Sequence, residues 1–87
     1  MKIVAKFTNT EGQTLIVTFD RSNNSFSDNM GRSGTYKTDP ATNTIAITGA
    51  ENITFTLVDA IDFKPGFTTK YTASNGKSGA ATIESVS

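Results

Sequence analysis

Apolar and polar residues alternate with a period of two along most of the chain. This is the pattern of β-strands that bury one face, because successive side chains of a strand point to opposite sides. No stretch longer than about ten residues keeps apolar residues at helical spacing. The first two strands have the inward faces Ile3, Ala5, Phe7 and Leu15, Val17, Phe19.

A polar segment at 20–34 separates these strands from the rest, and we expect it to be a loop with one short strand around Phe26. After it, apolar faces and turn residues recur at regular intervals, which indicates further strands. These strands are expected near 34–38, 43–48, 52–58, 60–64, 67–73 and 80–86.

Proline and glycine divide the later strands. Lys64-Pro65-Gly66 has the residues that a type II turn requires, and Asn75-Gly76 favours a type I′ hairpin in which both residues have positive φ. The last two strands should therefore be antiparallel neighbours. Ile83 and Val86 fall on opposite faces of the last strand, which predicts a β-bulge or a frayed end.

About eight strands with short connections predict an antiparallel meander, which in so short a chain closes into a small β-barrel. A β-sandwich is the alternative. We expect residues 1–87 to form a single domain whose inward side chains fill the barrel and leave little room for a ligand. If the first and last strands leave free edges, they could also pair two copies into a homodimer.

Composition narrows the chemistry further. The 87 residues contain eight Lys and Arg, eight Asp and Glu, and no Cys or His, so disulfides, Cys/His zinc sites and imidazole-based catalysis are excluded. Zero formal charge argues against nucleic-acid binding. Residues 1–7 form neither a signal peptide nor a membrane-spanning segment, which leaves a cytoplasmic protein or one exported after removal of a leader.

Residues 18–56 follow the order of elements of a known family. They comprise a strand ending in Phe19-Asp20, a short strand at Phe26, a turn at Asn29-Met30-Gly31 and a strand with Gly34-Thr35-Tyr36. This order resembles the META-domain family of small bacterial β proteins, whose members usually carry Cys where this chain has Met30. The resemblance implies a calycin-like fold without catalysis, and an envelope or stress-associated structural role.

Three motifs are weak matches to catalytic or cation sites. Asn75-Gly76-Lys77-Ser78 ends like a phosphate-binding loop but lacks its first glycine, so a turn is favoured. The loop 20–31 lacks the glycine and terminal glutamate of a calcium-binding EF-hand. Asp59 and Asp62 fall on opposite faces of one expected strand, and a hydrolase would need them to converge with Glu84 in a groove. We therefore predict no enzyme activity, no cofactor and no metal site.

The loop residues remain as the candidate site. A polar loop with one apolar and two cationic side chains on a rigid barrel is a common protein-binding surface, although it can also be an ordinary solvated loop. The leading hypothesis is a non-enzymatic module that binds another protein, such as a small inhibitor or phage-type antagonist. Its expected contact residues are Arg21, Asn29, Met30, Arg32 and Ser33.

Overall fold

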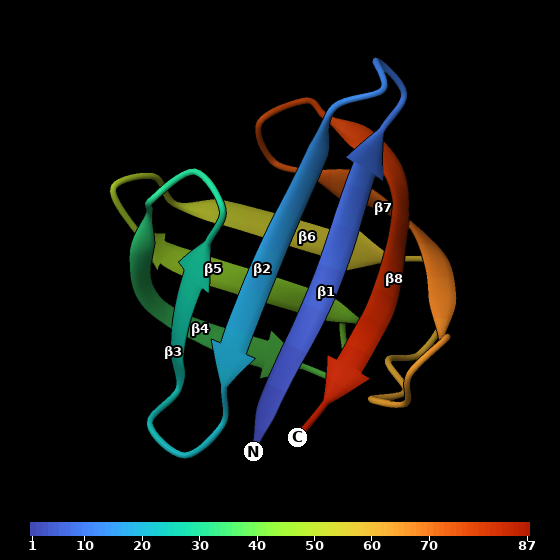
Figure 1. Ribbon diagram of the computed structural model, residues 1–87. Helices are drawn as coiled ribbons and strands as arrows, with labels where there is room; N and C mark the ends of the chain where they lie inside the picture. The colour runs from blue at the N-terminus through green and yellow to red at the C-terminus, as the bar shows by residue number, and fades with distance from the viewer.

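The chain forms a closed β-barrel of eight antiparallel strands in the computed structural model, which describes residues 1–87 (Figure 1). Each strand pairs with its neighbours in sequence, and β8 completes the barrel by pairing with β1. The predicted meander and barrel are confirmed, and the sandwich is excluded. The strands are β1 (Lys2–Asn9), β2 (Thr14–Asp20), β3 (Ser25–Asp28), β4 (Ser33–Asp39), β5 (Thr44–Gly49), β6 (Ile53–Leu57), β7 (Thr68–Ala73) and β8 (Ser78–Val86).

One apolar cluster fills the middle of the barrel. It contains the alternating residues of every strand, as the period-two pattern requires. Its members are Ile3, Ala5, Phe7, Val17, Phe19, Phe26, Tyr36, Ile45, Ile47, Ile53, Phe55, Leu57, Tyr71, Ala81 and Ile83.

β3 is the shortest strand and confirms the strand expected around Phe26. The Phe26 ring covers a cross-strand pair of glycines, Gly34 and Gly49, which leave the space that the ring occupies. Because β3 has only four residues while β2 and β4 each have seven, both neighbours extend past it.

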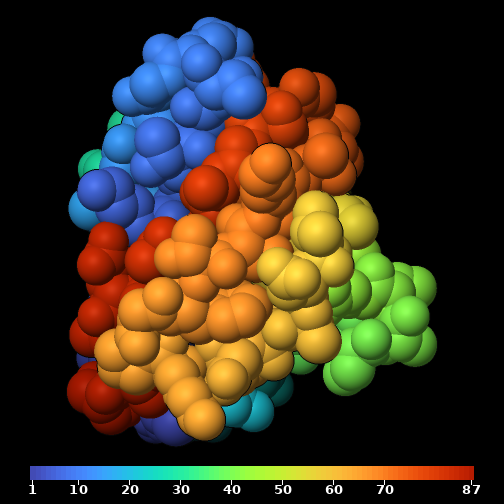
Figure 2. Space-filling view, turned by 90° about the vertical axis from the view of Figure 1, so that its right-hand side faces the viewer, coloured from blue at the N-terminus to red at the C-terminus, as the bar shows by residue number.

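The expected strand at 60–64 is wrong. Residues 58–67 form an irregular connection between β6 and β7, named here the plug loop. Its apolar residues Ile61, Phe63 and Phe67 pack against the core as a lid on one end of the barrel. The alternation of Ile61 and Phe63 reflects packing without strand pairing, whereas the Phe67 C=O accepts the N–H of Ile83 in β8 at 2.8 Å. Figure 2 shows this segment, in yellow and orange, spread over the lower part of the molecule.

Two turn predictions have different outcomes. The type II turn at Lys64-Pro65-Gly66 is confirmed, with φ of 91° at Gly66 and a hydrogen bond from Phe67 N to Lys64 O of 3.1 Å. The type I′ turn is wrong, because Gly76 alone has positive φ and its N–H donates to Ala73 O. These contacts define a three-residue hairpin loop that ends in a glycine bulge. β7 and β8 are nevertheless antiparallel neighbours, as expected.

The irregularity expected in the last strand is a β-bulge. The β1–β8 register pairs Val4 with Ser85 but Ala5 with Ile83, so Glu84 is the extra residue. This bulge turns Ile83 into the core and lets Val86 pack against it too.

Closure of the barrel pairs β1 with β8 along seven residue pairs. The free edges that suggested a homodimer are therefore not present on these two strands.

The structure contains no helix that could span a membrane.

Candidate binding site

The two ends of the barrel differ. In a meander, successive connections alternate between ends, so the turns at 9–13, 28–32, 49–53 and 73–77 lie at one end. The turns at 20–25 and 39–44, the plug loop and both termini lie at the other (Figure 1). We call the first the open end and the second the closed end.

Apolar side chains seal the closed end. Ile61, Phe63 and Phe67 of the plug loop cover it, and the interior space beneath them is only about 20 Å³. Asn43, which has a positive φ of 56°, fixes the start of the loop by donating from Nδ2 to Leu57 O (2.8 Å) and Asp59 O (2.6 Å). The expectation of a filled barrel is therefore correct for this end.

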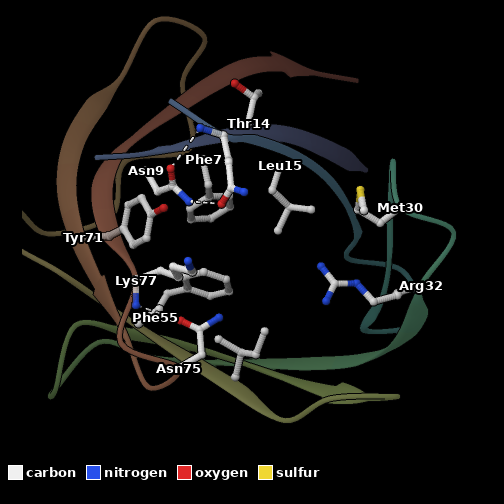
Figure 3. A pocket seen from close by; sticks show the side chains of 13 residues that line it. Phe7, Asn9, Thr14, Leu15, Met30, Arg32, Phe55, Tyr71, Asn75 and Lys77 are labelled. Atoms are coloured by element: carbon white, nitrogen blue, oxygen red, sulfur yellow. Dashed lines mark hydrogen bonds between the residues drawn. The ribbon is translucent and has the colours of Figure 1, made fainter. Parts of the chain in front are cut away.

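The open end holds a pocket of about 410 Å³, so the expectation of little room for a ligand is wrong there. Three aromatic rings form its base. The Phe7 and Phe55 rings stack with centroids 4.5 Å apart, and the Tyr71 ring meets them edge-on at 5.2 and 5.7 Å. Figure 3 shows Tyr71 with its hydroxyl directed into the pocket. This volume falls within the range of small-ligand sites.

Arg32 enters the pocket from the β3–β4 turn (Figure 3). Its Nε donates to Asp28 Oδ2 at 2.8 Å and its Nη1 to Glu51 Oε2 at 3.4 Å. The Asp28 side chain is fully buried, and its other oxygen accepts the backbone N–H groups of Met30 and Arg32. This carboxylate therefore shapes the turn and orients the guanidinium at the same time.

Polar side chains from the β1–β2 and β7–β8 turns complete the rim. Asn9 Nδ2 donates to Gln13 Oε1, and Lys77 Nζ donates to Glu11 Oε1 at 2.9 Å, which ties the two turns together. Asn75 lines the pocket beside Lys77. The sequence analysis did not select these rim residues, although the alternation of connections in a meander would have put both turns at the end where Met30 and Arg32 lie.

The five residues predicted from the sequence do not form one surface. Met30 and Arg32 line the open-end pocket, and Met30 is 69% exposed. Asn29 is used within the fold, where its Oδ1 accepts Ile16 N–H (3.1 Å) and its N–H donates to Ile16 O (3.0 Å). Ser33 is exposed at the start of β4. Arg21 lies at the closed end, in the β2–β3 turn.

Arg21 belongs to a second hollow of about 280 Å³, lined also by Tyr36, Lys37 and Phe63. Its guanidinium carbon lies 5.0 Å from the centroid of the Phe63 ring, the geometry of a cation–π contact. Arg21 therefore contacts the plug loop from the β2–β3 turn, within the fold.

Three ionisable groups have shifted pKa values. Burial raises the pKa of Tyr71. Burial also raises the pKa of Tyr36, and the positive charge of nearby Arg21 partly offsets this rise. The hydrogen bond from the Ser22 hydroxyl, followed by the Ser22 backbone N–H, lowers the pKa of Asp20. Tyr71 is the only one of the three that lines the open-end pocket.

The weak catalytic motifs gain no geometric support. Asp59, Asp62 and Glu84 line neither the open-end pocket nor the second hollow, and Asp59 Oδ2 accepts a hydrogen bond from Thr69 Oγ1. No group of three or more acidic side chains is placed to hold a metal ion. Residues 75–78 form the β7–β8 turn and the start of β8.

No protein-family model matches the chain, and no curated protein or solved structure does either. The resemblance to META domains therefore stays a prediction.

Proposed function

We propose that this chain is a non-enzymatic module that binds another protein through the open end of its barrel. The observation that carries the proposal is the difference between the ends. One end is sealed by the plug loop, while the other presents a 410 Å³ pocket ringed by hairpin turns. Rigid scaffolds commonly present their binding residues on such turns.

The side chains of the pocket support a binding role without catalysis. Its ionisable residues are Arg32, Lys77 and Tyr71. Arg32 is paired with Asp28 and Glu51, and Lys77 is paired with Glu11. Burial raises the pKa of Tyr71, which keeps its hydroxyl protonated at neutral pH. The Tyr71 hydroxyl is therefore not poised as a general base at that pH.

The rim supports a protein as the partner. Met30 exposes 69% of its surface next to the pocket, and flexible methionine is common at protein-binding surfaces. A small inhibitor or phage-type antagonist that covers a site on its target is the form of this function that we favour.

The second candidate is a structural domain of the cell envelope or stress response, as the META resemblance implies. The closed all-β meander agrees with the fold class that this resemblance predicts. This role requires no occupant of the pocket.

Affinity capture with two matched double variants tests the proposal. M30E/R32Q changes an exposed apolar residue and an arginine at the open end. V58E/R21Q makes the same changes at the closed end, where Val58 is 71% exposed. We expect the wild type and V58E/R21Q to retain one stoichiometric partner that M30E/R32Q loses. Retention by M30E/R32Q, or loss only with V58E/R21Q, would contradict the assignment to the open end.

A further inference from the structure

The second hollow, at the closed end, is lined by cations that have no partner. Arg21 and Lys37 line it, and none of its six lining residues is Asp or Glu. No ion pair of the structure includes either cation. Asp20 precedes Arg21 in the chain, but its Oδ1 accepts the N–H and the hydroxyl of Ser22, and it does not line the hollow. The hollow therefore differs from the open-end pocket, where both cations are paired with carboxylates.

A buried tyrosine presents its hydroxyl to this hollow. Only 7% of the Tyr36 surface is exposed, and its ring packs edge-on against Phe19 with centroids 4.8 Å apart. Its hydroxyl has no hydrogen-bond partner in the chain, yet no buried side-chain oxygen is left unpaired, so the hydroxyl reaches the surface where Tyr36 lines the hollow. Buried tyrosines usually place the hydroxyl against a hydrogen-bond partner. At Tyr36 that partner has to come from the hollow.

The edge of β4 adds a backbone donor. The Tyr36 N–H donates to Asn24 O at 3.0 Å, and the β3–β4 pairing ends at Ser25 and Thr35. Alternate residues of a strand direct their backbone groups to the same side. Thr38 therefore directs its N–H to the side of Asn24, where β3 has ended. Thr38 and Asn24 both line the hollow, so this N–H and the Asn24 amide are available to a ligand.

The guanidinium of Arg21 is held in place beside the Tyr36 hydroxyl. Its cation–π contact with Phe63, at 5.0 Å, restricts the side chain before any ligand arrives. Burial raises the pKa of Tyr36 and the Arg21 charge opposes this rise, as expected when the two groups are close. A side chain that is already ordered loses less entropy on binding.

We infer that the second hollow binds a phosphate group, either of free phosphate or of a small phosphate monoester. The Arg21 guanidinium, the Tyr36 hydroxyl and the Thr38 N–H donate to its oxygens, with the Asn24 amide and the Lys37 charge beside them. Phosphate oxygens commonly accept hydrogen bonds from these side-chain types and from backbone N–H groups.

The charge and size of the hollow favour this ligand. Two unpaired cations suit a phosphate, which has up to two charges and three acceptor oxygens, better than a carboxylate with one charge and two oxygens. The volume of about 280 Å³ lies just below the range of sites for drug-sized ligands and suits a smaller compound. The inference goes beyond the proposed function, because this hollow lies at the end of the barrel opposite to the partner-binding pocket.

Titration of the isotope-labelled full chain with sodium phosphate at constant ionic strength, followed by amide NMR shifts, tests the inference. Glycerol 2-phosphate is the monoester probe, and acetate and chloride are the control anions. We expect saturable shifts at Asn24, Tyr36 and Thr38 with both phosphate probes, and none at Tyr71. Acetate and chloride should bind more weakly. Tighter binding of glycerol 2-phosphate would identify a monoester as the ligand, and tighter binding of phosphate the free ion.

Matched variants locate the contact. Tyr36→Phe removes one hydroxyl and should weaken phosphate binding about tenfold, the lower limit for a hydrogen bond to a charged group. Tyr71→Phe removes the hydroxyl of the other buried tyrosine and should leave the affinity unchanged. Arg21→Gln should weaken binding about fivefold, whereas Lys70→Gln, which removes an exposed charge outside the hollow, should change it less than about twofold. Circular dichroism confirms that each variant is folded.

Four results would overturn the inference. They are absence of saturable shifts with both phosphate probes, shifts confined to the open end, equal binding by acetate or chloride, and unchanged phosphate affinity in Tyr36→Phe. The first two come from the wild type, so the inference is refutable even where a variant does not fold.

Discussion

The unequal ends of the barrel predict that truncating a buried Phe to Ala costs more folding stability at the closed end than at the open end. Phe55 and Phe19 are equally buried, each with 3% of its surface exposed. Phe55 borders the open-end pocket, whereas Phe19 faces the sealed interior, where the free space is about 20 Å³. We expect Phe19→Ala to lower the free energy of unfolding more than Phe55→Ala.

The magnitude follows from the space that each ring leaves. Truncation of Phe to Ala opens about 100 Å³, and an unrelieved cavity costs about 24 cal/mol per Å³, or about 2.4 kcal/mol. At Phe55 the vacated space would join the open-end pocket, so most of this cavity cost disappears. Phe55 loses two ring pairs and Phe19 loses one, to Tyr36, which reduces the difference by about 1 kcal/mol. The net difference is about 1.4 kcal/mol.

Urea unfolding followed by circular dichroism measures this difference. With an m-value of about 1.5 kcal/mol/M, the midpoints of the two variants should differ by about 1 M. A domain of 87 residues has a total stability of roughly 4–13 kcal/mol, so an Ala variant at the lower limit would unfold. If an Ala variant does not fold, the midpoints of Phe19→Leu and Phe55→Leu are compared instead. Equal midpoints, or a lower midpoint for Phe55→Ala, would refute the assignment of open and closed ends.

Three further predictions concern the turns, strand packing and pH. Asn43→Gly keeps the positive φ but loses two hydrogen bonds, so it should destabilise the barrel by about 1–3 kcal/mol in urea unfolding. Asn43→Asp should cost more, because a carboxylate would face two carbonyl oxygens. Equal stability of the wild type and both variants would refute this role of Asn43. Gly79→Ala should reduce the melting temperature strongly, because its Cβ would overlap Thr8 O on the adjacent strand, and an unchanged melting temperature would contradict that close approach. Burial raises the pKa of Tyr36 and Tyr71 above the ordinary 10.0, so their contribution to stability is complete below pH 10.0 and is lost as the pH rises through the raised values. Tyrosinate absorbance should therefore titrate at higher pH in the folded protein than in urea. Coincident titration curves would contradict the raised pKa values.

The sequence predicted most of the fold because each strand has one buried face. Period-two alternation identified the strands on either side of the polar segment 20–34, and the short strand within that segment was expected only from the apolar residue Phe26. It failed at 60–64, where Ile61 and Phe63 also alternate but pack onto the barrel end without a pairing partner. Alternation reports which side of the chain is buried and says nothing about hydrogen bonding, so the two cases look the same.

The open-end pocket was not predicted because counting inward residues does not say where they lie along the barrel axis. The plug loop adds three apolar residues to one end, and the other end has no equivalent. The candidate residues were also grouped by closeness in sequence. Arg21 and Arg32 are separated by β3, which carries them to opposite ends.

A turn pattern in the sequence could have shown which turns lie at the same end of the barrel. Asn9 and Gly12 have the same spacing as Asp28 and Gly31. In both turns the first side chain accepts the N–H groups two and four residues later, and the glycine has positive φ. Two matching hairpin turns separated by one intervening turn must lie at the same end of a meander.

Hydrogen exchange of the captured complex tests the central claim, partner binding at the open end, most directly. Amide protection should increase on partner binding at 9–16, 28–32 and 73–77, with the turns at 20–25 and 39–44 and the plug loop unchanged. Protection that increases at the plug loop and the β2–β3 turn, with none at the open end, would contradict the account.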